Sequence, residues 1–290
     1  MAEEKFTSLD PQGEEWESFR AEGHRMLDMM VDNLMSLRKQ PVWQPVPSSV
    51  REGFRSARVP ENSGTLSDFT AAFQENVLPY SVGNRHPGFM GWVHGGGTPV
   101  GMLAEMLAAG LNANLGGRDH APVEVERMVI RWAATLMGFP QDASGVLVTG
   151  SSMANFIAVI VASRATQDGL ELRSNGVKER KLVGYAAQSA HGCVSRAFDL
   201  AGLGCNALRL VPLSQDFRMD TETLRQMIET DQKAGLEPFL VVGTAGTVDV
   251  GAIDPLDEIA AIARAEKLWF HVDGAFGALA TLSSRLRPKL

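Results

Sequence analysis

The feature that most constrains the fold is a regular alternation of short apolar runs and amphipathic segments from Gly145 onward. Strands of a parallel sheet are buried on both faces and carry continuous apolar runs, and helices connect them. The pattern therefore predicts an α/β fold with a mostly parallel sheet covered by helices on both faces. Strands are expected at 146–148, 182–186, 207–211, 239–242 and 268–272, with helices at 153–164, 192–203, 221–234 and 255–266.

The first part of the chain has a different pattern. Apolar residues at helical spacing predict a helix over residues 14–37, and a second helix over residues 66–77 follows a proline-rich connector. We interpret residues 1–85 as a helical N-terminal arm and residues 86–290 as the large domain. The apolar stripe of the first helix fits either core packing or contact with a partner helix.

Composition argues against several classes of function. The net charge of −7 makes a nucleic-acid or anionic-membrane surface unexpected. Cys193 and Cys205 have no metal-ligand spacing and suggest no disulfide framework, and the histidines form no His-Glu-x-x-His motif, so no metal site is expected. The acidic N-terminus is not a signal peptide, and no apolar run approaches the ~20 residues that span a bilayer. We expect a cytoplasmic protein.

An acidic residue, Asp273, ends the last apolar run, and small residues follow it. Side chains at the carboxyl ends of parallel strands face the ligand crevice of such folds. A carboxylate buried there needs a partner, because burying it alone is very costly. A cationic ring nitrogen on a bound cofactor would be such a partner. A simple cap on the following turn is the alternative.

The segment Thr149-Gly150-Ser151-Ser152-Met153 lies where a strand is expected to pass into a helix. The free N–H groups of a helix N-terminus bind phosphate readily, and two serine hydroxyls add donors. Helix capping by serine explains the same residues, so both interpretations stay open. The segment is neither a Walker loop nor a Gly-x-Gly-x-x-Gly fingerprint.

Two more polar residues follow expected strands. His191, among small residues, is suited to lie flat on a planar ligand, or it simply starts a helix. Thr247 offers a hydroxyl to the same crevice, or belongs to an ordinary turn. Asp254, before Pro255, is interpreted as a helix cap. The crevice would thus offer a phosphate cup from the serines, a stacking ring from His191, a hydroxyl from Thr247 and an anion from Asp273. This combination points to pyridoxal phosphate.

The chain resembles the group II pyridoxal-phosphate-dependent amino-acid decarboxylases, the family of aromatic-L-amino-acid decarboxylase. The likeness covers nearly the whole chain, although sibling families of the same fold share parts of it. The segments that carry it are, in order, Asn-Arg-His-Pro-Gly-Phe at 84–89, Gly-Ser-Ser-Met-Ala-Asn at 150–155, Ala-His at 190–191, Gly-Thr at 246–247, Gly-Ala-Ile-Asp at 251–254 and His-Val-Asp-Gly-Ala-Phe-Gly at 271–277.

The resemblance implies a role for each crevice residue. Val248 stands where many members have a second threonine, which puts a hydroxyl contact from that position in doubt. The segment 92–99 aligns with the family's substrate-pocket loop, so Trp92, His94 and Gly95 are the expected substrate contacts, and its glycine-rich form leaves substrate choice open. By resemblance, Ser151, Ser152 and the backbone at Met153 would hold the cofactor phosphate, His191 would stack on the pyridine ring, Asp273 would pair with the pyridine nitrogen, Ala275 would pack under the ring, and Thr247 would lie in the Gly-Thr-Thr region.

The resemblance implies an activity, with His191 and Asp273 as the catalytic residues. It implies decarboxylation of an L-amino acid, with aromatic substrates favoured, to an amine and CO2. It also implies a homodimer in which the arm wraps the partner. Another pyridoxal-phosphate enzyme of the same fold, an aminotransferase or a desulfurase, and a non-catalytic binding protein are the alternatives.

The family's Schiff-base lysine is expected a few tens of residues after the aspartate, preceded by a histidine. Lys289 has no histidine before it and no strand that carries it, and we reject it. We therefore expect this chain to be the N-terminal part of a longer enzyme, without the small C-terminal domain, and to be unable to turn over substrate normally by itself.

Overall fold

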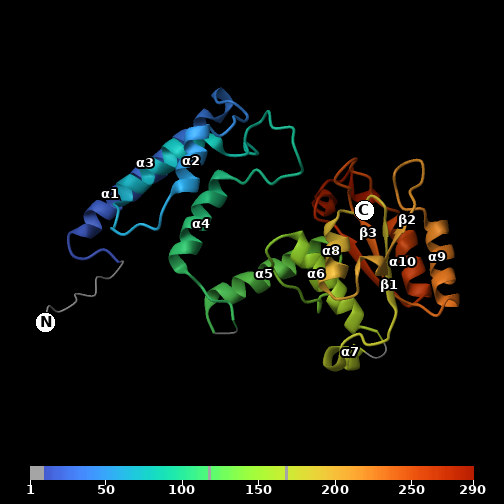
Figure 1. The fold of residues 1–290 in the computed structure, drawn as a ribbon. Coiled ribbons are helices and arrows are strands. Elements are labelled where there is room, and N and C mark those ends of the chain that lie inside the picture. The colour runs from blue at the N-terminus through green and yellow to red at the C-terminus, as the bar shows by residue number, and fades with distance from the viewer. Residues whose placement is uncertain (1–9, 117–118, 167–168) are drawn as a thin grey trace. The chain divides into compact units, whose positions relative to one another are not determined.

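The computed structural model describes residues 10–116, 119–166 and 169–290 (Figure 1). The chain divides into two compact units, with the boundary between Ala113 and Asn114. None of the helices in these ranges is both long enough and apolar enough to cross a membrane.

The N-terminal unit consists of helices and turns. Helices α1 and α3 confirm the two helices predicted from apolar spacing, and they contact each other. Two other helices were missed from the sequence: α2 is short and has only Val50 and Phe54 as large apolar residues, and α4 is apolar on nearly every side, which obscures a helical period. The helices are α1 (Glu15–Ser36), α2 (Ser48–Ser56), α3 (Leu66–Asn76) and α4 (Pro99–Leu111).

The C-terminal unit is built on a parallel sheet, as predicted. Its strands lie in the order β2-β1-β3-β4, and every neighbouring pair is parallel. The carboxyl ends of β3 and β4 are aligned, because Thr244 pairs with Asp273. The strands are β1 (Leu182–Ala187), β2 (Leu208–Val211), β3 (Glu237–Thr244) and β4 (Trp269–Asp273).

The strand expected at 146–148 was wrong. These residues belong to no strand, and Val146 and Leu147 are 59% and 58% exposed. The N–H of Leu147 donates to the Glu126 carboxylate at 3.3 Å, not to a strand. An apolar run becomes a strand only where a neighbouring strand bonds to it, and the four strands of the sheet pair among themselves.

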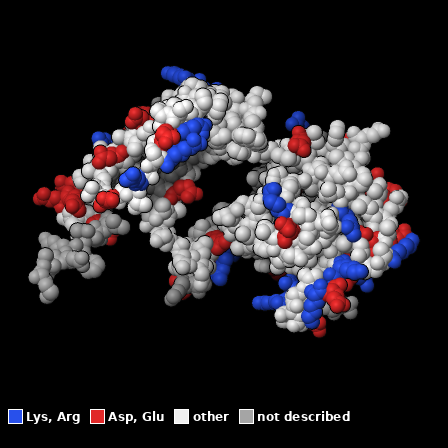
Figure 2. Space-filling view, in the orientation of Figure 1, with Lys and Arg blue, Asp and Glu red and all other residues white. Residues whose placement is uncertain are grey.

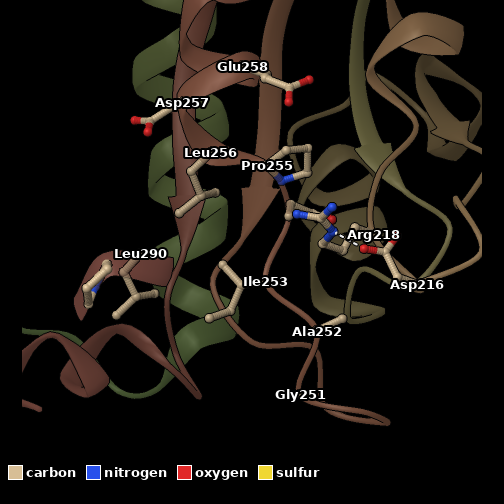
Figure 3. A pocket seen from close by; sticks show the side chains of 12 residues that line it. Asp216, Arg218, Gly251, Ala252, Ile253, Pro255, Leu256, Asp257, Glu258 and Leu290 are labelled. Carbon is tan, nitrogen blue, oxygen red and sulfur yellow. Dashed lines mark hydrogen bonds and ion pairs between the residues drawn. The ribbon is translucent and has the colours of Figure 1, made fainter. Parts of the chain in front are cut away.

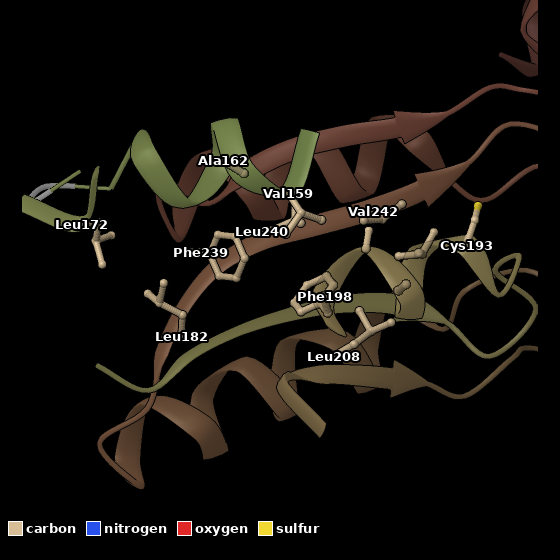
Figure 4. Close-up of a cluster of buried hydrophobic side chains, with 13 residues drawn as sticks. Val159, Ala162, Leu172, Leu182, Cys193, Phe198, Leu208, Phe239, Leu240 and Val242 are labelled. Atoms are coloured by element: carbon tan, nitrogen blue, oxygen red, sulfur yellow. The ribbon is translucent and has the colours of Figure 1, made fainter. Parts of the chain in front are cut away.

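Helices cover both faces of the sheet. Alternate residues of β1 face opposite sides: Leu182 and Ala186 pack in the cluster of α6 and α8, shown in Figure 4, whereas Val183 and Tyr185 pack in the cluster of α9 and α10. Such burial on both faces is the reason for the continuous apolar runs in the sequence. The helices of this unit are α5 (Ala121–Leu136), α6 (Ser151–Arg164), α7 (Gly169–Asn175), α8 (Cys193–Leu200), α9 (Thr221–Lys233) and α10 (Leu256–Ala265).

Asp254 is not the helix cap expected from the sequence. The N-cap of α10 is Pro255, without a side-chain bond. The buried Asp254 carboxylate instead accepts the backbone N–H groups of Met219, at 2.7 Å, and Thr244, at 2.8 Å. It ties the end of β3 to the chain before α9. Burial raises the pKa of this carboxyl, and the two backbone bonds oppose that shift.

The surface carries charges of both signs. On the face of the C-terminal unit drawn in Figure 2, lysine and arginine are interspersed with aspartate and glutamate.

Candidate active site

The candidate site lies at the carboxyl ends of β1, β3 and β4, beside the start of α6. Parallel strands bring their carboxyl ends to one edge of a sheet, so residues far apart in sequence meet there. His191 and Thr247 follow such strands and Asp273 ends one, whereas Ser151 starts α6. This edge is where the sequence predicts the ligand site.

The start of α6 presents free backbone donors. Gly150 is the N-cap, with φ of +84° that favours glycine, and no side chain caps the helix. The first intrahelical bond runs from the N–H of Ala154 to the carbonyl of Gly150, at 3.3 Å. The N–H groups of Ser151, Ser152 and Met153 precede it and remain directed beyond the helix. The serines are therefore not N-caps, and the anion-binding interpretation is favoured.

Asp273 ends β4 with its carboxylate engaged on two sides. Oδ2 accepts from Nδ2 of Asn155 at 3.2 Å, and Oδ1 accepts from the backbone N–H of Ala275 at 3.1 Å. Asp273 therefore also caps the turn that follows β4, which is the alternative interpretation given by the sequence. Each carboxylate oxygen has a second lone pair, so the group can still accept a bond from a ligand.

Asn155 connects the parts of the site. It is 3% exposed, and its Nδ2 lies 3.0 Å from the Ser151 carbonyl oxygen, 3.2 Å from Asp273 Oδ2 and 3.4 Å from Cys193 Sγ. One side chain therefore joins the start of α6, the start of α8 and the end of β4. This contact is what brings the phosphate-cup serines and the carboxylate into one cluster.

His271 supports Asn155 from β4. It lies two residues before Asp273, on the same face of the strand, and its Nε2 is 2.8 Å from Asn155 Oδ1. An amide oxygen only accepts, so Nε2 carries the proton. Burial lowers the pKa of His271, and the nearby Asp273 carboxylate opposes this shift. The imidazole is held neutral as a donor.

His191 lies exposed at the mouth of the site. Its Nδ1 accepts the backbone N–H of Cys193 at 3.2 Å, which leaves Nε2 as the donor of the neutral ring.

Cys193 itself is 1% exposed. Burial, and then the negative charge of Asp273, raise the pKa of its thiol. The thiol is therefore neutral and packs as a small apolar group.

Thr247 closes a loop beside the site. It is buried, its N–H donates to the Ala252 carbonyl at 2.8 Å, and its hydroxyl accepts the Ala252 N–H at 3.1 Å. The hydroxyl proton remains for another acceptor. The loop after β4 packs closely on the loop after β3, since a Cβ at Gly277 would lie 2.3 Å from the Ala245 carbonyl oxygen.

The expected substrate contacts lie in the N-terminal unit. The rings of Phe89, Trp92 and His94 form a cluster in which Phe89 is half-buried and the other two are exposed. The Trp92 and His94 ring centroids are 5.4 Å apart, with 29° between the ring planes. The Asn84 amide donates to the Gly95 carbonyl at 2.8 Å and holds this segment.

Three residues of the site were missed as functional from the sequence. Asn155 ends the Gly-Ser-Ser-Met-Ala-Asn segment, and a polar residue inside an otherwise apolar helix is a usable signal. His271 lies two residues from Asp273, and that spacing on a strand could have placed both on one face. Cys193 was weighed only for metals and disulfides.

A cavity of about 660 Å³ lies elsewhere, beside the segment 251–258 (Figure 3). The ion pair between Asp216 and Arg218, at 2.6 Å, borders it. Neither the serines of α6 nor His191 and Asp273 line this cavity. It is distinct from the crevice described above.

Comparisons with known proteins bear on this site. A model of the pyridoxal-dependent decarboxylase conserved domain matches residues 47–290. An aromatic-L-amino-acid decarboxylase of Bacillus atrophaeus is 30% identical over 273 residues, which cover 93% of this chain and 55% of that protein. The L-aspartate decarboxylase dtxS4 of Metarhizium robertsii is 30% identical over 247 residues, covering 84% and 49%.

Solved structures of decarboxylases also match this chain. The crystal structure of Catharanthus roseus tryptophan decarboxylase in complex with L-tryptophan matches with a TM-score of 0.84 and 27% identity, covering 96% of this chain and 59% of that one. The chain spans about half the length of the curated relatives it matches.

Proposed function

Because the chain belongs to the pyridoxal-dependent decarboxylase family, we propose that it forms the cofactor-binding part of an enzyme that converts an L-amino acid to an amine and CO2 with pyridoxal 5'-phosphate. The observation that carries this proposal is the Asn155 side chain, which joins the start of α6 to the Asp273 carboxylate. A ligand with a phosphate at one end and a cationic ring nitrogen at the other fits these two features.

The phosphate would bind at the start of α6. The N–H groups of Ser151, Ser152 and Met153, with the two serine hydroxyls, supply donors for several phosphate oxygens. The helix dipole favours an anion at this end. No acidic side chain lies in the first turn of α6 to oppose it.

Asp273 would hold a proton at the ring nitrogen, because an adjacent anion favours the charged form of a base. When bound, the cofactor supplies an electron-poor ring that withdraws the electron pair left on the α-carbon as CO2 departs. His191 would lie against one face of the ring, with Nε2–H as its free donor. Ala275 would pack below the ring, and Thr247 would offer its hydroxyl proton.

The proposed substrates are aromatic L-amino acids, although one relative carries the name of an aspartate decarboxylase. Trp92, His94 and Gly95 are the proposed substrate contacts, and the exposed rings of this segment suit a flat apolar side chain. A panel of L-tryptophan, L-tyrosine, L-phenylalanine and L-aspartate, assayed for amine and CO2 with the protein at its full natural length, tests this. Preference for aspartate would reject the aromatic assignment.

We also propose a homodimer in which residues 1–85 form an arm that packs on the partner. Large apolar side chains of the N-terminal unit, such as Trp16, Phe19 and Met35, are exposed in the single chain. Exposed apolar surface on this scale is typical of an interface. Sedimentation of the full-length protein should give a dimer, and a monomer at micromolar concentration would contradict the proposal.

The decisive experiment replaces Asp273 with Ala in the full-length protein. The variant should lose most of its amine production and hold its cofactor weakly. Asp257→Ala, an exposed aspartate on α10, is the matched control and should behave as the parent. An Asp273→Ala protein that retains its cofactor and forms amine at the parent rate would overturn the proposal. Formation of a keto acid in place of amine and CO2 would do the same.

A further inference from the structure

Asn155 has an environment that packing alone does not explain. It lies in the first turns of α6, and its amide has partners on three elements: the Ser151 carbonyl of its own helix, Cys193 of α8, and His271 and Asp273 of β4. A buried amide that lost these partners would pay the full desolvation cost. The side chain therefore has one defined position.

The direction of the amide is also fixed. The Ser151 carbonyl and the Asp273 carboxylate can only accept, so Nδ2 must face them and Oδ1 faces His271. If the amide were turned over, its oxygen would face these two acceptors, and both contacts would be repulsive. The two acceptors thus select the orientation, and Oδ1 in turn selects the His271 tautomer that carries its proton on Nε2.

The protons of Nδ2 are assigned by the same geometry. The nitrogen has two protons and three acceptors, of which the Cys193 sulfur is the weakest and the most distant, at 3.4 Å. The two protons therefore serve the Ser151 carbonyl and Asp273 Oδ2. The second of these is a hydrogen bond to an anion, the stronger class of hydrogen bond.

We propose that Asn155 is a positioning residue: held by the Ser151 carbonyl and contacted at Oδ1 by His271, it holds the Asp273 carboxylate at the place where a cationic ring nitrogen would meet it. This inference rests on the proposed function for the identity of the ring. Asn155 itself need not touch the cofactor. It fixes Oδ2 from the α6 side while the Ala275 N–H fixes Oδ1, so the carboxylate is anchored at both oxygens.

Two simpler roles make different predictions. If Asn155 served only the phosphate cup, through its bond to the Ser151 carbonyl, its loss would weaken every ligand that carries the phosphate. If it served only packing, its loss would lower stability and leave the recognition of the ring nitrogen unchanged. A positioning role predicts a loss that depends on the ring nitrogen.

The first experiment uses a pair of ligands that differ only at that nitrogen. Pyridoxamine 5'-phosphate and its analogue with carbon in place of the ring nitrogen are titrated into the 290-residue chain by calorimetry. Neither has an aldehyde, so neither reacts with surface lysines. Asn155→Leu nearly keeps the side-chain shape and removes the donor without adding a second carboxyl group beside Asp273. It should lower the affinity for pyridoxamine 5'-phosphate roughly ten- to a hundredfold, as expected for a hydrogen bond to a charged group.

Affinity for the carbon analogue should change less than about twofold in the same variant, because that ligand makes no use of Asp273. Asn155→Ala should behave similarly if it folds. Ser163→Ala is the control: Ser163 is also a buried polar residue of α6, but its hydroxyl bonds to the Ile160 carbonyl at the far end of the helix. It should leave both affinities unchanged. An equal loss of both ligands, or no loss of either, would overturn the positioning role.

A second experiment needs no ligand. In the 15N-labelled chain, Asp273→Ala should shift the side-chain amide signals of Asn155 and the Nε2 signal of His271, and Ser163→Ala should not. Signals that do not respond to Asp273→Ala would refute the hydrogen-bonded chain. If they respond and the parent chain binds neither ligand, the network stands and the proposed cofactor is wrong. The two ideas can therefore fail separately.

Discussion

The two units of the chain differ in how far they bury their apolar side chains. In the C-terminal unit, the buried hydrophobic residues run from Val159 to Leu268 and enclose the sheet on both faces. In the N-terminal unit, Glu22 is the one residue that is buried among those the structure describes. Helix α4 leaves Val100, Leu107 and Leu111 at least 65% exposed. The sheet closes its own core, whereas the helices of the N-terminal unit do not enclose their apolar side chains among themselves.

The sharpest test of this contrast makes the same substitution in both units. Leu240 is fully buried in β3, so Leu240→Ala should cost about 2–5 kcal/mol in the free energy of unfolding. Leu107 is 70% exposed on α4, so Leu107→Ala should change it by less than about 0.5 kcal/mol. Hydrogen exchange and urea denaturation of the 290-residue chain measure both. A Leu107→Ala cost of several kcal/mol would break the contrast and would mean that another copy covers α4.

Replacing a glycine with alanine should change the free energy of unfolding in opposite directions in the two units. A Cβ at Gly184 in β1 would lie 2.6 Å from the Phe198 ring and 3.2 Å from the Leu240 carbonyl oxygen. Gly184→Ala should therefore destabilise the C-terminal unit by about 1–3 kcal/mol, through overpacking. Gly53 lies inside α2 with nothing within 4 Å, so Gly53→Ala should stabilise that helix by about 0.5–1 kcal/mol. Circular dichroism under urea distinguishes the two, and a neutral Gly184→Ala would show that Phe198 can move away.

The sequence predicted the sheet because burial on two faces leaves a direct mark, a continuous apolar run. It failed at 146–148, where the apolar run is real but no neighbouring strand bonds to it. It also failed at α4, where apolar residues on every side erase the helical period. Both errors have one cause. The local pattern reports which residues avoid water, and it does not report what covers them.

The site shows the same limit. Motifs predicted Ser151, His191 and Asp273, and the family that they suggested is confirmed by the domain match over residues 47–290. Asn155 was not singled out, because its partners in β4 lie 116 and 118 residues away. The role of Asp254 was misjudged for a similar reason, since one of its donors, Met219, lies 35 residues away. Short-range motifs indicate candidate ligand contacts, but the bonds that orient these side chains depend on the tertiary fold.

The smallest expected effect is a pH dependence that belongs to the C-terminal unit alone. His271 has a lowered pKa in the folded chain, chiefly because it is buried, whereas the unfolded chain takes up the proton near pH 6.5. The unfolded state therefore binds more protons as the pH falls. Stability should be complete above about pH 7 and decline below about pH 6.5, with a slope of at most about 1.4 kcal/mol per pH unit.

The variant His271→Gln isolates this contribution, because glutamine can still donate to Asn155 Oδ1 and has no proton to gain. The difference in unfolding free energy between the parent and His271→Gln, measured by urea denaturation between pH 5 and 8, should shrink or reverse as the pH falls. Asp254 acts in both proteins and cancels in this difference; its raised pKa favours the folded state at acidic pH. Parallel pH profiles for the two proteins would mean that His271 takes up its proton equally in both states. His271 would then not be the buried neutral donor described above.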